Sequence, residues 1–93
     1  TNFNKRWDKR WRIVIFDIPE KKRSLRARVR TLVREFGFLK LQNSVWVFPY
    51  DCEELIAMMK AELRIGKDVL YIIADSIEND RWVRRQFNLP QEP

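Results

Sequence analysis

The sequence predicts one α+β domain in which strands and helices follow the order βαββαβ. Two β-branched, apolar runs, residues 13–16 and 69–74, have the composition of buried strands. Apolar residues recur at helical spacing in two other stretches, residues 21–37 and 51–66. Right-handed crossovers fold this order into a four-stranded antiparallel sheet with both helices on one face, the ferredoxin-like arrangement.

Length and composition set the domain organisation. The chain has 93 residues, of which 45% are hydrophobic and 34% charged, so it can build one folded core and has no room for a second. We expect a basic N-terminal arm (1–11), a ferredoxin-like domain (12–76) and a C-terminal tail or short helix (77–93). Because the chain begins at Thr1 and not at methionine, we also expect it to be part of a longer protein.

The first strand and the first helix follow the arm. The apolar run Ile13 to Phe16 gives the strand, and Pro19 ends its ladder of hydrogen bonds. From about Lys21 the apolar residues recur at intervals of one, three or four, which is typical of one helical face. Gly37 provides a C-terminal cap for this helix.

The second half repeats the pattern. Residues 38–41 and 45–48 predict two strands joined by a polar turn, and residues 51–54 (DCEE) predict a capping box that starts a helix ending at Gly66. After the strand 69–74 comes a capped stretch around Asn79. We expect its apolar residues to lie on one side; they are Trp82, Val83 and Phe87.

The predicted sheet keeps one face that its two helices do not cover. That face has to pack against the tail, another domain or a second copy of the chain. We expect a second copy, and therefore a homodimer.

Charge and residue types limit the possible functions. The net charge is +6, and residues 1–34 hold twelve of the Lys and Arg residues against three acids, which favours a polyanionic partner. Nucleic acid, in particular double-stranded DNA, fits a cytoplasmic protein; an anionic membrane surface is the lesser option, and no segment is apolar enough to span a bilayer. One cysteine and no histidine exclude a zinc site, an internal disulfide and a Cys-His nucleophile.

Two basic segments are candidates for binding nucleic acid. Four arginines fall in one stripe of the first helix, opposite its apolar face, where they can follow a phosphate backbone; they are Arg23, Arg26, Arg30 and Arg34. The arm adds Lys5, Arg6, Lys9 and Arg10. The alternative for both segments is a solvated surface. The tryptophans could stack on bases, although such residues more often belong to a core or an interface.

Asp17 is the candidate catalytic and metal-binding residue. It follows the first strand directly, where a carboxylate can hold Mg²⁺. One aspartate is a poor site, so this hypothesis needs Glu20 nearby or a second Asp17 across a twofold axis. The alternative is a cap of the following turn, or an ion pair with one of the next basic residues, Lys21, Lys22 or Arg23.

Residues 12–18 (RIVIFDI), the arginine-rich helix ending at Gly37, and residues 41–46 (LQNSVW) together resemble the CRISPR-associated Cas2 family. The resemblance covers about residues 12–75. It implies a homodimer, and in the CRISPR proteins a metal-dependent nuclease or the core of the spacer-integration complex, with Asp17 at the position of the metal ligand. Mg²⁺ is implied only for a nuclease.

Other details are more similar to the central Cas2-like domain of PaaX-type transcriptional repressors. They are residues 11–12 (WR), 18–20 (IPE), 37–38 (GF) and 45–49 (VWVFP). In that branch the resemblance implies a dimerisation and regulatory module, and no nuclease. The main hypothesis is thus a homodimeric, nucleic-acid-associated domain of a PaaX-like regulator or of a CRISPR-adaptation protein. The alternatives are a metal-dependent endonuclease and a protein-interaction module whose basic face is incidental.

Overall fold

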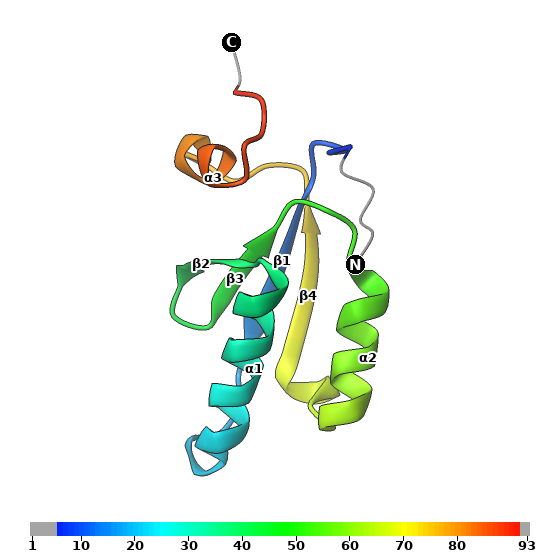
Figure 1. Cartoon of the computed structure of the whole chain (residues 1–93). Helices are drawn as coiled ribbons and strands as arrows, with labels where there is room; N and C mark the ends of the chain where they lie inside the picture. The colour runs from blue at the N-terminus through cyan, green and yellow to red at the C-terminus, as the bar shows by residue number, and fades with distance from the viewer. Residues whose placement is uncertain (1–5, 92–93) are drawn as a thin grey trace.

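A computed structural model describes residues 6–91 of the chain (Figure 1). The strands are β1 (Trp11–Phe16), β2 (Leu39–Gln42), β3 (Val45–Phe48) and β4 (Val69–Ala74), and the α-helices are α1 (Arg23–Phe36), α2 (Glu53–Leu63) and α3 (Arg81–Gln86). Short 3-10 turns precede α1 (Glu20–Lys22) and β4 (Gly66–Asp68). The sheet order is β2-β3-β1-β4 with every neighbouring pair antiparallel, which confirms the predicted ferredoxin-like fold.

The main core lies between the sheet and the helices α1 and α2. Because successive residues of a strand point to opposite faces, Val14 and Phe16 of β1 face the helices. There they pack with Val29 and Val33 of α1 and with Trp46 of β3 in one buried cluster. These positions explain the apolar spacing of α1, whose polar residues face outward.

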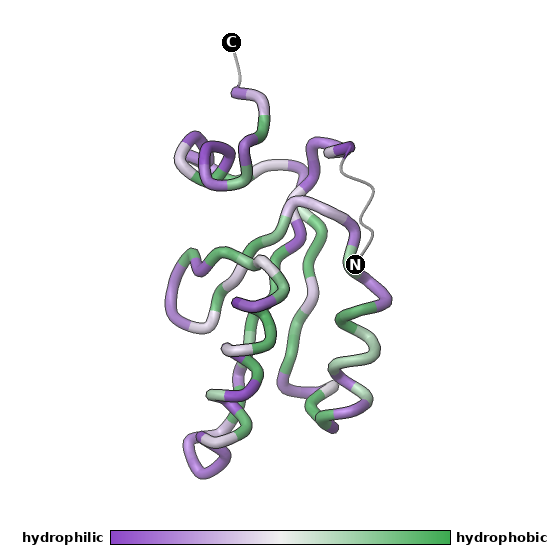
Figure 2. The backbone as a smooth tube through the Cα atoms, viewed as in Figure 1, coloured by the Kyte–Doolittle hydropathy of each residue, from purple (hydrophilic) through white to green (hydrophobic). Residues whose placement is uncertain are grey.

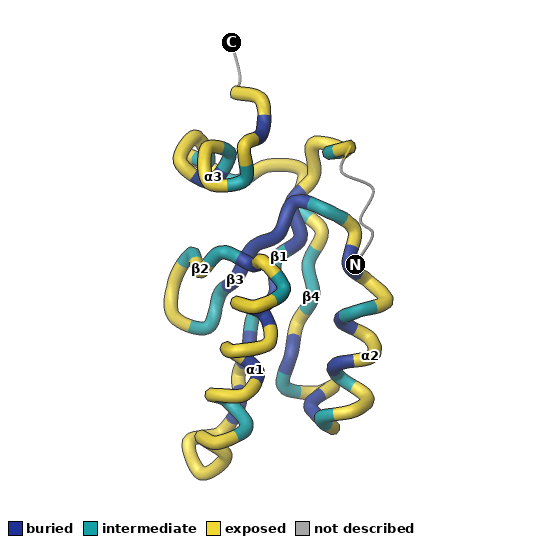
Figure 3. Tube along the Cα trace, viewed as in Figure 1, coloured by how far each residue is buried: buried dark blue, intermediate teal, exposed yellow. Residues whose placement is uncertain are grey.

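The opposite face of the sheet is apolar but only partly covered. Ile13 and Ile15 of β1 are half-buried, and Leu70 of β4 is 57% exposed. Figure 2 shows β4 as largely hydrophobic, yet Figure 3 shows most of it as intermediate or exposed. We call this side the open face; its residues are Ile13, Ile15, Val45, Leu70 and Ile72.

One end of the open face is closed by the C-terminal part of the chain. Val83 of α3 and Leu89 of the tail are buried there against Trp11 and Val47 of the sheet. The tail therefore covers the end where β1 begins and leaves the rest of the open face accessible, as the position of α3 beyond the strand ends shows (Figure 1).

The two edges of the sheet differ. The outer strand β2 has a register shift between Lys40 and Gln42, a bulge that interrupts its ladder. The outer strand β4 pairs with β1 without interruption and contains no charged residue or proline. Within the described residues, no strand pairs with the free edge of β4.

Several predicted boundaries hold, and others need correction. Gly37 caps α1 in the left-handed region, with φ of 116°, as predicted. The capping box predicted for residues 51–54 does not form, because α2 begins after Cys52. The Asp51 carboxylate accepts a hydrogen bond from the Glu53 amide (3.1 Å). The helix ends earlier than expected, since Arg64 adopts the left-handed conformation at its C-terminus.

Trp82 does not share the buried side of α3 with Val83, because Trp82 is 41% exposed.

Candidate nucleic-acid interface

The arm is fixed to the sheet by a buried arginine. Arg12 of β1 is only 6% exposed, and its guanidinium donates to both carboxylate oxygens of Asp8 (2.8 and 2.7 Å) and to the carbonyl of Pro49 (3.0 Å). These hydrogen bonds from Arg12 lower the pKa of Asp8 from 3.8 to about 2. The Asp8 carboxylate in turn raises the pKa of Arg12. The result is a clamp that gives residues 8–12 a defined path.

Aromatic rings join this arm to α3. The rings of Trp7 and Trp11 lie 4.9 Å apart, and the guanidinium of Arg84 lies 4.8 Å from the Trp7 ring. Asp80 accepts hydrogen bonds from the Arg84 Nε (2.9 Å) and from the Trp11 indole (3.3 Å). The arm, the start of β1 and α3 therefore form one unit.

This arrangement brings together cations that are far apart in the sequence. Of the predicted arm residues, Lys5 lies outside the described residues, whereas Arg6, Lys9 and Arg10 are exposed. Arg10 also forms an ion pair with Asp75 (3.5 Å). The helix α3 adds cations at the same end of the molecule, which the sequence reasoning missed; they are Arg81, Arg84 and Arg85.

The arginines of α1 form a second basic surface, but not the uniform stripe that we predicted. Arg23 and Arg30 are exposed. Arg26 is half-buried and donates to Glu20 (2.7 Å), and the guanidinium of Arg34 lies 5.7 Å from the Trp46 ring. Since Trp46 lies between the sheet and the helices, Arg34 lies on the flank of α1 that faces β3.

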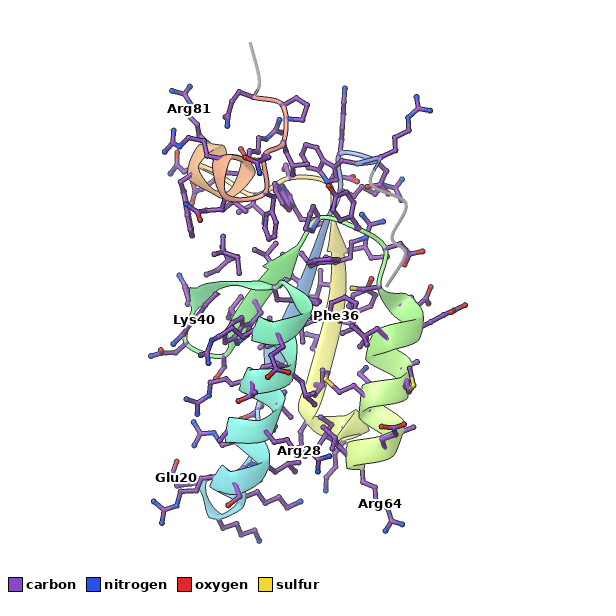
Figure 4. All side chains as sticks on the ribbon, viewed as in Figure 1. Glu20, Arg28, Phe36, Lys40, Arg64 and Arg81 are labelled. Atoms are coloured by element: carbon purple, nitrogen blue, oxygen red, sulfur yellow. The ribbon has the colours of Figure 1, made fainter. Side chains whose placement is uncertain are left out.

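The two predicted basic segments begin at opposite ends of the molecule. The arm lies where β1 begins, and Arg23 starts α1 near the opposite end of the same strand (Figure 1). Figure 4 shows Glu20 and Arg81 at opposite ends of the molecule. Nucleic acid that contacts the arm therefore need not reach Arg23.

Asp17 is exposed at the end of β1 next to a second acid. Its backbone N–H donates to the carbonyl of Asp68 (2.7 Å), and the buried Oδ2 of Asp68 has no hydrogen-bond partner within the described residues. Glu20, the other expected ligand, is instead held by Arg26. No group of three or more possible metal ligands occurs in the described part of the chain. The carboxylates between residues 6 and 91 of one chain therefore do not fit a two-metal site.

The single thiol is enclosed beneath the sheet. Cys52 is buried at the start of α2, and its Sγ lies 3.7 Å from the hydroxyl of Tyr71. Burial raises the pKa of the Cys52 thiol to about 11 and also raises the pKa of Tyr71. A thiol in this state is a packing residue and not a nucleophile.

The open, one-sided sheet and the flanking basic residues define a ferredoxin-like domain with an uncovered face. The family model for the PaaX protein central Cas2-like domain matches residues 4–90, and the chain belongs to that family. No curated protein matches the chain. None of its described helices has the length and apolar character that a bilayer span requires.

Proposed function

We propose that the chain is the dimerisation and regulatory part of a PaaX-like, DNA-binding transcriptional regulator that acts in the cytoplasm as a homodimer. The open face supports this proposal most directly, because it exposes Leu70 beside the half-buried, apolar Ile13 and Ile15. Sheet faces of this kind pack against another sheet at about 10 Å. A second copy offers the same face through a twofold axis.

The family supports the regulator over the CRISPR-adaptation protein. The matching model describes the PaaX branch and spans most of the chain. In a regulator, a dimerisation domain sets the spacing of two DNA-binding units on a symmetric site. The open face would serve that role without any catalytic residue.

Light scattering tests the dimer. The mass should be twice the 11.4 kDa of the chain, and Ile15→Asp should reduce it to that of a monomer while the domain stays folded. Met58→Asp is the matched control, because Met58 is an exposed apolar residue on α2, away from the open face. A wild-type monomer at micromolar concentration, or a dimer that tolerates Ile15→Asp, would contradict the proposal.

Double-stranded DNA is the proposed nucleic-acid partner. Arg23 and Arg30 leave their guanidiniums exposed on α1, whereas Arg26 is already held by Glu20. Phosphate contacts of this kind give affinity with little sequence preference and a steep dependence on salt. Replacing Arg23 and Arg30 by glutamine should lower the slope of log K against log salt by about 2.

Changing all four arginines of the stripe to glutamine should flatten this salt dependence further. Arg26→Gln alone is the control, since its guanidinium is engaged within the chain. If affinity and slope survive the fourfold replacement, α1 has a solvated face and the domain is a protein-interaction module.

A metal-dependent endonuclease is the second candidate, because Asp17 is exposed beside Asp68 at the end of β1. One chain supplies too few carboxylates, so the site would need Asp17 from both protomers around Mg²⁺. We expect little or no cleavage of DNA or RNA. Metal-dependent cleavage that disappears in a still-dimeric Asp17→Asn variant would make the endonuclease the better assignment.

A further inference from the structure

A hollow of about 440 Å³ lies beside α3, and Figure 1 shows α3 at the end of the molecule opposite the start of α1. Its size falls within the range of small-molecule sites. Both polar and charged side chains line it; they are Asn79, Asp80, Arg81, Trp82, Arg85 and Gln91. None of these residues belongs to the open face or to the arginine stripe of α1 as defined above.

Trp82 is the unusual residue of this hollow. The other three tryptophans are buried or half-buried, whereas the Trp82 side chain is 41% exposed. A part-exposed indole offers a flat aromatic surface on which another ring can stack.

The charges around Trp82 favour an anion. Arg81 and Arg85 lie one helical turn apart on α3, and neither forms an ion pair with any residue between 6 and 91. Asp80 also lines the hollow, but Arg84 neutralises its carboxylate (2.9 Å). The available charge is thus two guanidiniums, groups that bind phosphate through paired hydrogen bonds.

A further side chain supplies polar atoms at the rim. The Gln91 amide nitrogen donates to the carbonyl of Arg81 (3.2 Å), which fixes the tail against α3. The amide oxygen of Gln91 then remains available as an acceptor. Figure 4 shows Arg81 pointing outward from α3, into solvent.

We propose that this hollow binds a nucleotide, with the base stacked on Trp82 and the phosphate held by Arg81 and Arg85. A planar ring joined to an anionic group satisfies the exposed indole and both guanidiniums together. The same chemistry is present in a free nucleotide and in a single strand of nucleic acid. Double-stranded DNA does not provide it, because its bases are stacked within the duplex.

Binding of a labelled single-stranded oligothymidylate at low salt, measured by anisotropy on the full chain, tests this proposal. Trp82→Leu should weaken binding about tenfold, and Trp82→Phe, which keeps an aromatic ring, should retain most of the affinity. The double variant Arg81→Gln with Arg85→Gln should weaken binding at least as much. Arg28→Gln on α1 is the control, because Arg28 lies far from α3 (Figure 4).

Competition identifies the source of the nucleotide. Displacement of the strand by AMP indicates a site for free nucleotides, and binding of the strand without displacement indicates a single-strand site; both results support the proposal. Three results overturn it: unchanged binding after Trp82→Leu, binding of duplex only, or conversion of a dimer to a monomer by Trp82→Leu. The dimer itself is tested by Ile15→Asp, so failure of this site leaves the proposed function standing.

Discussion

The two faces of the sheet differ in how completely the chain covers them. Val14 is fully buried under α1 and α2, whereas its neighbour Ile15 on the open face is only half-buried. The two residues have nearly the same hydrophobicity and differ mainly in the face to which they point. The comparison shows that the first face is completed within one chain, whereas the second stays partly exposed within the described residues.

Substituting aspartate at these two neighbouring positions gives the largest expected contrast. Val14→Asp places an unpaired carboxylate in the main core and should cost more than about 4 kcal/mol, a large part of a small domain's stability. Ile15→Asp should cost the isolated domain only about 1 kcal/mol. Circular dichroism and thermal melting measure both. If both variants unfold, the open face belongs to the core of the single chain and the contrast between the faces is wrong.

A smaller loss of stability is expected from a substitution at the end of α1, one of the two helices that cover the Val14 face of the sheet. Gly37 has φ of 116°, so Gly37→Ala should lose about 1–2 kcal/mol through backbone strain. The added Cβ would meet Phe48 at an ordinary 3.4 Å, so backbone strain dominates. Denaturant unfolding should show this loss with the oligomeric state unchanged.

Gly66→Ala is the matched control for Gly37→Ala. No heavy atom lies within 4 Å of a Cβ at Gly66, and its φ is not positive, so this variant should be neutral or slightly more stable. Equal losses at both glycines would mean that conformational strain does not explain the role of Gly37.

The smallest predicted effect concerns pH and the clamp at the end of the sheet. The pKa of Asp8 is lowered to about 2, so the ion pair with Arg12 stabilises the fold above pH 4, and this stabilisation is lost as the pH falls through 2. Asp8→Asn should therefore lower the melting temperature at pH 7, and the difference from the parent chain should shrink toward pH 2. A constant difference over this range would exclude Asp8 as the titrating group.

Local signals account for what the sequence could predict. The strand at residues 69–74 and the cap at Gly37 follow from composition within a few residues, and both agree with the structure. The capping box failed because Cys52, and not Asp51, occupies the N-cap position of α2.

The position of the arm beside α3 depends on contacts between distant parts of the chain. Trp11 reaches Asp80 across most of the sequence, and the Trp7 ring meets Arg84 in the same cluster. The spacing of apolar residues gives no information on contacts between distant segments. The same spacing grouped Trp82 with Val83 and Phe87, which are more buried. Counting arginines in residues 81–85 would have shown a second basic segment, but not that the arm lies beside it.

The free edge of β4 has a consequence for how the protein behaves when it is concentrated or partly unfolded. The segment Val69–Ala74 combines high β-propensity with no charge and no proline, the features of sequences that stack into cross-β aggregates. The bulge of β2 protects the other edge from such growth, and β4 has no equivalent device. The lifetime of the soluble protein should therefore be limited by this one segment, and a lysine at Leu70 would protect it at the expense of the open face.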